Sequence, residues 1–336
     1  MFDKLKEIRK KEVEVSAILK SPVKLKNLTG DIGLENVISE AHVHRPQLAL
    51  AGFTDLFNYS DVQIIGNTEI YYLKSIGAAK AKESFSNIVK FDIPCLIVTN
   101  NNDLEDEYIE IAKQNNVPIF KTELDTTTAI SVLSVFLNDM FSPHVNLHGS
   151  FIDVYGVGLL FTGGSGIGKS EIALDLVERG HRLVADDVVI LNNNTGTALM
   201  GTGTNLVQHF MEIRGLGIID VRRMFGIRSI RYQKRLEIIV ELEVWDSKGD
   251  YTRTGLEEKH TQILGVDIMT VKLPIFPGKN ITVIAETIAL NYLLKTYGYN
   301  ASEVFTNKLN ETILNKSTKK NNIDDRIINY FQGDLE

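Results

Sequence analysis

Cysteine is almost absent from this chain of 336 residues, which contains only Cys95. A single cysteine excludes a disulfide within the chain and a zinc site built from several cysteines. Cys95 lies in the apolar run "FDIPCLIVTN", which is typical of a buried strand, and free cysteine is among the residue types most often buried. We therefore expect Cys95 to pack in a hydrophobic core.

The chain also lacks a basic excess and any long apolar run. Its 36 lysines and arginines are outnumbered by 43 aspartates and glutamates, which gives a net charge of -7. Because dedicated nucleic-acid binders usually carry a basic surplus, no nucleic-acid partner is expected. No stretch approaches the roughly 18 apolar residues of a membrane helix, and the charged start "MFDKLKEIRKKEVEV" does not resemble a secretion signal. These absences favour a cytoplasmic protein without membrane contact.

The length of the chain, with 43% hydrophobic residues, suits two domains that each bury a core. Between about Glu12 and Leu124, apolar runs alternate with helical patterns, which favours an α/β unit. In chain order, "NIVKFDIPCLIVTN" predicts a strand, "EDEYIEIAKQNN" an amphipathic helix and "VPIFKTE" another strand. "DTTTAISVLSVFLNDMF" predicts a helix capped by Asp125 or a neighbouring threonine, which ends before Pro143.

A domain boundary is expected near that proline. We expect an N-terminal α/β domain at 1–140, a catalytic domain at 141–316 and a polar tail at 317–336. The second domain opens with the β-rich "FIDVYGVGLLFTG", and further strands are expected in "RLEIIVELEVW" and "ITVIAE".

A phosphate-binding motif follows the first of these strands. "GGSGIGKS" matches G-x-x-x-x-G-K-[ST], with the apolar "GVGLLFT" before it and an amphipathic helix after it. On that helix Ile172, Ala173, Leu176 and Val177 share one face, and Gly180 can end it. The candidate nucleotide-binding residues are Gly163, Gly164, Ser165, Gly166, Ile167, Gly168, Lys169 and Ser170.

The residue types in this motif suit a polyphosphate. Glycines let successive backbone N–H groups turn inward on phosphate oxygens, and the helix N-terminus adds its positive dipole end. Lys169 supplies a mobile charge for the β- and γ-phosphates, and the Ser170 hydroxyl is a candidate Mg²⁺ ligand.

Two acids, Asp186 and Asp187, end the expected strand "HRLVADD" one helix after the motif. Side chains at the carboxyl ends of parallel strands point into the crevice where ligands bind. A carboxylate there can hold a metal or accept a proton from an attacking hydroxyl, whereas the alternative interpretation is an ordinary strand-end turn.

These residues resemble the bacterial HPr kinase/phosphorylase family. The segments that carry the resemblance are "LHGSFIDVYGVGLLFTGGSGIGKSEIALDLVERGHRLVADD", "MEIRGLGIIDVRRMFG", "GLEEKH", "LPIFPGKN" and "RPQLALAGF". The resemblance implies a kinase domain similar to phosphoenolpyruvate carboxykinase. It also implies phosphorylation of a serine of the phosphocarrier HPr by ATP (or pyrophosphate) with Mg²⁺. The reverse reaction uses phosphate and releases pyrophosphate. A homohexamer and control of carbon metabolism are likewise implied.

The resemblance also assigns roles to single residues. His148 matches an active-site histidine, and Asp187 matches the base that takes the serine proton. Asp186 matches a position close to the metal, and Glu212 in "MEIRG" matches a second magnesium position. Arg253 in "YTRTGLEE" matches an arginine that neutralises the transferring phosphoryl group.

The chain departs from the family in the loop that is associated with dephosphorylation. Its residues are Pro274, Ile275, Phe276, Pro277, Gly278 and Lys279. Phe276 and Lys279 stand where arginine is common, and lysine lacks the planar fork that binds phosphate in two places. We therefore expect kinase activity to be kept and phosphorolysis to be weaker. Thr252 also stands where an acidic neighbour of Arg253 is usual.

Two other functions remain open from the residues. The chain could be a P-loop small-molecule kinase or NTPase that shares the fold, which "MEIRGLGIID" and "LEEKH" argue against. It could also be a nucleotide-sensing regulator, but a sensor needs no general base such as Asp187.

Overall fold

A computed structural model describes residues 2, 5–194, 196–204, 207–245, 259–276 and 278–318, with side chains up to residue 313. The chain forms two compact units. The N-terminal unit comprises Met1–Leu147, Ile190–Met200 and Leu264–Val266, and the C-terminal unit comprises the remainder. Over the described ranges, the helices are all too short or too polar to cross a lipid bilayer.

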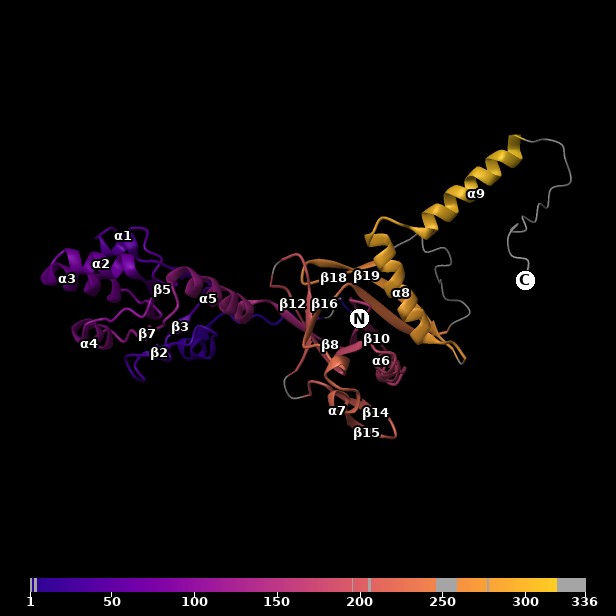
Figure 1. The fold of residues 1–336 in the computed structure, drawn as a ribbon, viewed down its shortest axis with the longest axis horizontal. Coiled ribbons are helices and arrows are strands. Elements are labelled where there is room, and N and C mark those ends of the chain that lie inside the picture. Colours follow the sequence, from indigo (N-terminus) through magenta and orange to yellow (C-terminus); the bar gives the residue numbers. More distant parts are fainter. Residues whose placement is uncertain are drawn as a thin grey trace. The chain divides into compact units, whose positions relative to one another are not determined.

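The N-terminal unit is built on a five-stranded sheet. The strand order is β2 (Lys26–Asn27), β7 (Ile119–Lys121), β6 (Leu96–Val98), β5 (Val62–Ile65) and β4 (Val43–His44). Strands β4 to β7 are parallel, and β2 is antiparallel to β7. The helices of one side are α1 (Gln47–Leu50), α2 (Asn67–Ser75), α3 (Ala78–Val89) and α4 (Asp106–Gln114), and α5 (Thr126–Phe141) lies on the other side (Figure 1). The expected α/β architecture is confirmed.

Two hydrophobic clusters cover the two faces of this sheet. Val62 and Ile64 point to the side of α5, where they join Leu133 in one cluster. Ile65 belongs to the opposite cluster, together with Phe85 of α3. This division follows from the twofold side-chain period of a strand. A small β1 (Val13–Glu14) and β3 (Val37–Ile38) pair and a 3₁₀ helix at Val15–Lys20 complete the unit.

The sequence predictions for this unit are mostly confirmed. α5 begins after Asp125, whose carboxylate accepts a hydrogen bond from Thr128 N at 3.0 Å, and ends at Ser142. Cys95 is fully buried, directly before β6. The strand predicted over "NIVKFDIPCLIVTN" is wrong in its first part, because Asn87–Val89 ends α3.

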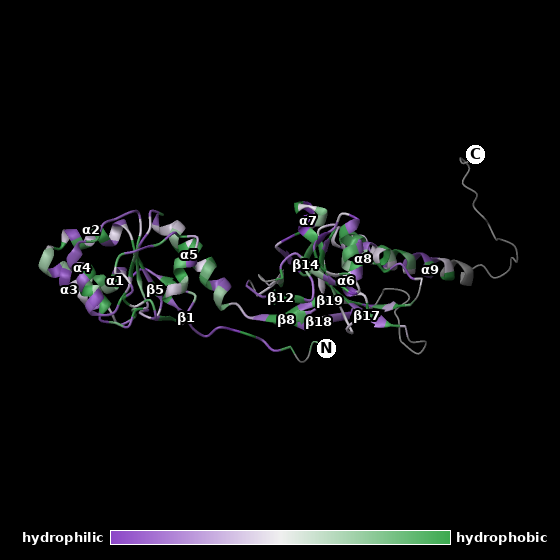
Figure 2. Ribbon diagram, turned by 90° about the horizontal axis from the view of Figure 1, so that it is seen from below, coloured by the Kyte–Doolittle hydropathy of each residue, from purple (hydrophilic) through white to green (hydrophobic). Residues whose placement is uncertain are grey.

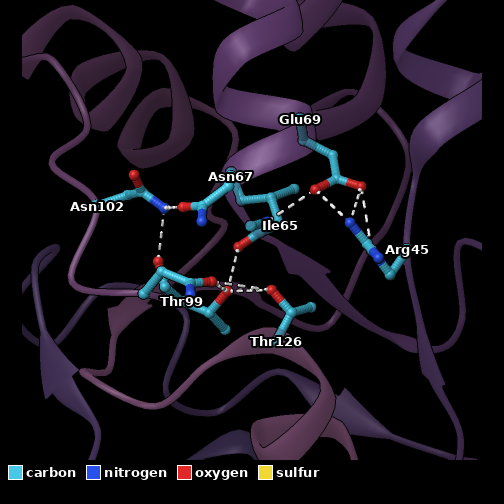
Figure 3. Close-up of polar contacts among 9 residues, drawn as sticks. Arg45, Ile65, Asn67, Glu69, Thr99, Asn102 and Thr126 are labelled. Carbon is cyan, nitrogen blue, oxygen red and sulfur yellow. Dashed lines mark hydrogen bonds and ion pairs between the residues drawn. The ribbon is translucent and has the colours of Figure 1, made fainter.

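An ion pair between buried Glu69 and half-buried Arg45 connects the start of α2 to the segment after β4. Arg45 donates to both carboxylate oxygens of Glu69 at 3.1 and 2.9 Å, and Gly66 N donates to the same carboxylate at 2.8 Å (Figure 3). Burial raises the pKa of Glu69. The hydrogen bonds from Arg45 and Gly66 outweigh it, so the net pKa is lowered.

We expect Glu69→Gln to destabilise this region by about 1.5–3 kcal/mol, the worth of hydrogen bonds to a charged group. Because the pKa of Glu69 is lower in the folded state, its ionised carboxylate stabilises the protein at pH values above the unfolded-state pKa of about 4.3. This contribution is lost as the pH falls through the folded-state pKa. Hydrogen exchange of residues 62–75 should therefore quicken in the variant at pH 7, with a smaller difference in acid. Glu83→Gln, at an exposed position, is the control. Equal exchange in both variants at pH 7 would contradict the prediction.

The C-terminal unit contains a six-stranded sheet. Its order is β11 (Arg182–Ala185), β9 (Ser150–Val154), β10 (Val157–Gly163), β17 (Ile238–Val244), β19 (Val266–Ile275) and β18 (Lys259–Ile263). β10, β17 and β19 are parallel, and β9 is antiparallel to both β10 and β11. The carboxyl ends of β10 and β11 therefore meet at the same edge of the sheet. The other elements of this unit are β13 (Met200–Gly203), β14 (Phe210–Ile213), β15 (Gly217–Asp220), α7 (Val221–Phe225), a 3₁₀ helix at Ile227–Ser229, β16 (Gln233–Arg235) and α9 (Ala301–Thr318). Most of β8 (His144–His148) and of β12 (Val188–Asn192) belongs to the N-terminal unit.

Helices α6 (Lys169–Glu178) and α8 (Ile281–Thr296) share one core with this sheet. The face predicted for α6 is confirmed, since Ile172, Ala173, Leu176 and Val177 are its buried residues. Gly180 follows the helix with a φ of +97°, the left-handed conformation that favours glycine.

The strand predicted at "ITVIAE" is wrong, because these residues begin α8. Asn280 caps the helix through its side chain, which accepts a hydrogen bond from Val283 N at 3.1 Å. Figure 2 shows α8 as largely hydrophobic. Ala285 and Ala289 bury one side of it in the core, and this packing overrides the strand preference of the β-branched residues at its start.

Candidate active site

The loop between β10 and α6 has the backbone that its glycines permit. Gly163, Gly166 and Gly168 have φ values of +141°, +76° and +99°. A Cβ atom on Gly163 would lie 2.5 Å from Leu242 O, so the close approach of strand β17 also requires glycine there. The loop therefore leads directly from the end of a buried strand to a helix N-terminus, an arrangement that suits phosphate oxygens.

Lys169 and Ser170 open the helix and point to different partners. The Lys169 ammonium donates to the carbonyl oxygens of Gly163 and Gly164 at 3.2 and 3.0 Å, so it lies over the loop. The Ser170 hydroxyl donates to Asp186, at 2.9 Å from Oδ2 and 3.1 Å from Oδ1. The predicted lysine thus bonds to the loop itself, whereas the predicted metal-binding serine bonds to the acid at the end of β11.

Asp186 is a buried carboxylate held by two hydroxyl groups. It is 4% exposed, and Ser150 donates to its Oδ1 at 2.5 Å in addition to the bonds from Ser170. Burial raises the pKa of Asp186, although the hydrogen bonds from the two serines oppose this shift. A nearby cation would stabilise the charged form of such a carboxylate.

Asp187 projects from the same turn but is exposed. Its side chain is 75% exposed, and His148, at 76%, places Nδ1 3.5 Å from its Oδ1 and 3.2 Å from its carbonyl oxygen. The φ of Asp187 is +65°, a conformation in which aspartate and asparagine are enriched among residues other than glycine. The adjacent Gly149 N donates to the carbonyl oxygen of Asp187 at 3.1 Å. The turn therefore aims one acid into the protein and the next toward solvent.

A pocket of about 280 Å³ brings together seven of the predicted site residues and Asp186, whereas Gly163, Gly164 and Ile167 of the predicted loop do not line it. It is lined by Ser150, Ser165, Gly166, Gly168, Lys169, Ser170, Glu171, Asp186, Asp187, Glu212 and Arg214. Glu212 arrives on β14, and Arg214 follows it in the turn to β15. A Cβ atom on Gly166 would lie 2.6 Å from Arg214 Nη1, so this guanidinium closes over the loop.

Ser150, Glu171 and Arg214 were not among the predicted site residues. Arg214 stands in the quoted segment "MEIRG", two residues after Glu212, and Ser150 directly follows the pair His148–Gly149. Glu171 lies in the first turn of α6, where the helix dipole stabilises a carboxylate in any protein, so its position alone does not indicate a functional site. For Ser150 and Arg214 the signal was the position beside a predicted residue.

Other predicted residues do not line this pocket. His148 touches Asp187 at its edge, while Arg253 and Pro277 lie outside the described residues. In the loop from Pro274 to Lys279, the Lys279 ammonium donates to Pro274 O at 2.9 Å and lies 5.3 Å from the centroid of the Phe276 ring. Partial burial lowers the pKa of Lys279. Lys279 is thus engaged within its own loop.

The oxygen ligands in the pocket fit Mg²⁺. Among the described residues, no group of three or more histidine, cysteine, aspartate or glutamate side chains is close enough to hold a metal alone. Mg²⁺ is usually bound by one or two carboxylates together with substrate phosphates, so a smaller set suffices. Ser170 Oγ and the Asp186 carboxylate provide two such oxygen groups in contact with each other.

The fold and the site define an α/β protein with a strand–loop–helix turn of the kind that suits phosphate groups, beside paired acids. The model of the HPr Serine kinase C-terminal domain matches residues 139–309, and the model of the HPr Serine kinase N terminus matches residues 13–137. The chain belongs to the HPr serine kinase family. The resemblance inferred from the sequence motifs is confirmed.

Two relatives agree with this assignment. The chain is 51% identical to a "HPr kinase/phosphorylase" of Chloroherpeton thalassium, over 99% of both chains. It is also 51% identical to a protein of the same name from Prosthecochloris aestuarii, over 89% of this chain and 88% of that protein. A solved structure of the Hpr(Ser) kinase/phosphatase from Coxiella burnetii is 33% identical and covers 48% of this chain and 97% of its own, with a TM-score of 0.43.

Proposed function

We propose that this chain transfers the γ-phosphoryl group of ATP to a serine of HPr, and reverses the transfer with inorganic phosphate. The observation that carries the proposal is one pocket lined by the phosphate-binding loop and by Asp187. The loop suits the phosphates of a nucleotide, and an exposed carboxylate beside it suits a hydroxyl delivered by a protein. HPr is the substrate that the names of the relatives indicate.

In the forward direction, the backbone N–H groups of the loop and Lys169 bind the phosphates. The serine oxygen attacks the γ-phosphorus, the bond to the β-phosphate oxygen breaks, and ADP leaves. Asp187 accepts the serine proton, and His148, 3.5 Å from its carboxylate, keeps that side chain at the edge of the pocket.

In the reverse direction, a phosphate oxygen attacks the phosphorus of phosphoserine. Asp187 returns a proton to the departing serine oxygen, and pyrophosphate forms. The same carboxylate serves both directions because the two reactions pass through related transition states.

Bound Mg²⁺ would neutralise charge on the transferring phosphoryl group. Ser170 and Asp186 are the proposed residues that hold it, and Glu212, which lines the same pocket, is a proposed second position. Arg214 joins them as a proposed phosphate contact, since its guanidinium lies over Gly166. Arg253 stays a proposal from the sequence.

The loop from Pro274 to Lys279 provides a prediction on the balance of the two activities. We expect wild type to run phosphorylation faster than phosphorolysis, because Lys279 bonds to Pro274 O within its own loop. Phosphorolysis brings two phosphate groups together and needs well-placed cations, and arginine binds phosphate in two places at once. Lys279→Arg should raise phosphorolysis more than phosphorylation, measured as the ratio of initial rates at equal HPr.

Lys259→Arg, at an exposed position of β18, is the matched control. A ratio that stays the same in Lys279→Arg, or equal rates in wild type, would show that this loop does not limit phosphorolysis.

Further features remain proposals. We place the domains at 1–140 and 141–316, with a tail at 317–336, and relate the kinase domain to phosphoenolpyruvate carboxykinase. A cytoplasmic homohexamer is the proposed assembly. Exposed apolar side chains on α8 and α9, among them Leu290, Leu294, Phe305 and Leu309, provide surface that assembly can bury. Light scattering of the purified protein tests the hexamer.

An acceptor comparison tests the proposed substrate. The protein and ATP are mixed with HPr, with HPr whose phosphorylated serine is replaced by alanine, or with small hydroxyl compounds. Phosphoryl transfer is expected only in the first mixture. Transfer to the small compounds, with none to HPr, would instead support a small-molecule kinase.

A further inference from the structure

A hollow of about 540 Å³ lies in the N-terminal unit, where β7 ends. Its polar lining includes Lys24, Lys26, Lys121 and Asn101, and Val23 and Leu124 add apolar surface. Ligands of parallel α/β sheets bind at the carboxyl ends of the strands, and this hollow has the size of a small-molecule site.

Two of the lysines face each other across neighbouring strands. Lys26 of β2 and Lys121 of β7 are directly opposite in the antiparallel register. Like charges in this position destabilise a sheet. Lys121 pairs with Asp103 at 2.5 Å, but the Asp103 side chain is 96% exposed, and exposed pairs stabilise little. Asp103 also attracts Lys26, so it offsets part of the repulsion between the two lysines, and a bound anion would offset the rest.

Two lining residues have a backbone conformation that is unusual outside glycine. Lys24 and Asn101 have φ values of +51° and +52°, and Asn100 beside Asn101 has +61°. Residues held in the left-handed region cost about 1–3 kcal/mol each and concentrate at ligand sites. Lysine is not among the residue types enriched there.

The walls of the hollow are fixed by hydrogen bonds. Thr122 Oγ1 donates to Val23 O at 2.8 Å, and Asn101 N donates to Thr122 O at 3.0 Å. Thr99 and Thr126 each lie two residues from a lining residue in sequence, and their hydroxyls are 2.7 Å apart (Figure 3). The donors are thus presented on a framework that is already formed.

The lysine and asparagine donors have spare capacity. Among the described residues, no carboxylate lies within 4 Å of the Lys24 or Lys26 ammonium, and no side-chain hydrogen bond forms at Asn101. Glu123 lies on the hollow's described lining and Asp103 pairs with Lys121 beside it, so two carboxylates stand against three lysines. The lining is therefore net positive in a chain whose net charge is -7.

We propose that this hollow binds a small metabolite through a single phosphate group. Lys26 and Lys121 share the phosphate, and Lys24 and the Asn101 amide donate to its remaining oxygens. Val23 and Leu124 contact the carbon part of the ligand. Glu123 on the rim disfavours a second anionic group, so a monophosphate fits better than a polyphosphate.

The test is the rate at which each lysine of the full chain is acetylated with and without ligand. Because each lysine is measured separately, binding in this hollow is distinguished from binding in the nucleotide pocket. The probe is glycerol 3-phosphate, and glycerol is the matched control without the phosphate. When the concentration of glycerol 3-phosphate is twice its Kd, acetylation of Lys24 and Lys26 should slow about threefold, because the rate falls by the factor 1 + [L]/Kd. Lys80 and Lys90, which are exposed on the same unit, should react unchanged.

Variants separate binding from folding. Lys26→Gln should raise the thermal stability of the ligand-free protein, because one of the two facing charges is removed. The variant should also lose the stabilisation that glycerol 3-phosphate gives wild type. Lys26→Arg keeps the charge and should keep binding, and Lys80→Gln should behave as wild type. The proposal is overturned if Lys24 and Lys26 are protected no more than Lys80 and Lys90. It is equally overturned if glycerol protects them as well, or if Lys26→Gln binds the probe with unchanged affinity.

Discussion

Replacing Asp187 with asparagine is expected to slow phosphoryl transfer in both directions by about 10²–10⁴, the usual contribution of a general base. An amide cannot accept the serine proton. Asparagine also adopts the left-handed backbone of this position, where φ is +65°, so the turn should be preserved. Nucleotide affinity should change little, because Asp187 is 75% exposed and Lys169 and the loop are intact.

The measurement is the initial rate of HPr phosphorylation and of phosphorolysis, with ATP affinity taken from a separate titration. Asp267→Asn, at an exposed position of β19 in the same unit, is the control and should retain both rates. Near-normal rates in Asp187→Asn would make Asp187 a structural strand end. The base would then have to be another residue.

Lys169→Ala is expected to abolish measurable transfer and to weaken ATP binding. Removing one electrostatic contact to the reacting group costs about 10²–10³ in rate, and Lys169 is the only lysine on the described lining of the pocket. The ammonium also donates to Gly163 O and Gly164 O, so the variant loses contacts that order the loop. Both effects act in the same direction.

Lys169→Met separates the two causes, because it keeps the aliphatic stem and loses the charge. We expect it to be as inactive as Lys169→Ala, while Lys259→Ala at the exposed edge of β18 remains active. Unchanged HPr phosphorylation in either Lys169 variant would contradict the assignment of the loop. Thermal unfolding of each variant verifies that the fold is retained.

The phosphate-binding loop could be predicted in detail because its requirements are local. The strand, the glycines with positive φ and the helix face with Ala173 and Leu176 all follow from consecutive residues. The two acids were expected at a strand end, and β11 does end there. The sequence did not indicate that Asp186 would be buried and Asp187 exposed, because that difference depends on the turn between β11 and β12.

The start of α8 illustrates why local preference fails elsewhere. Residues Ile281 to Ile284 favour a strand by composition, but Asn280 caps a helix and Ala285 and Ala289 pack it into the core. Likewise Arg214 is brought over Gly166 by the β14–β15 hairpin. Contacts between segments this far apart in sequence have no local signature.

The most direct test of the account is a two-step labelling experiment with the full chain. Purified HPr, Mg²⁺ and ATP labelled in the γ-phosphate are incubated with the protein, and unlabelled phosphate is then added. We expect label to move to the serine of HPr and to leave it, after the phosphate is added, as labelled pyrophosphate. HPr with that serine replaced by alanine should take no label. Label that stays in ATP, or that appears only as free phosphate without passing through HPr, would contradict it.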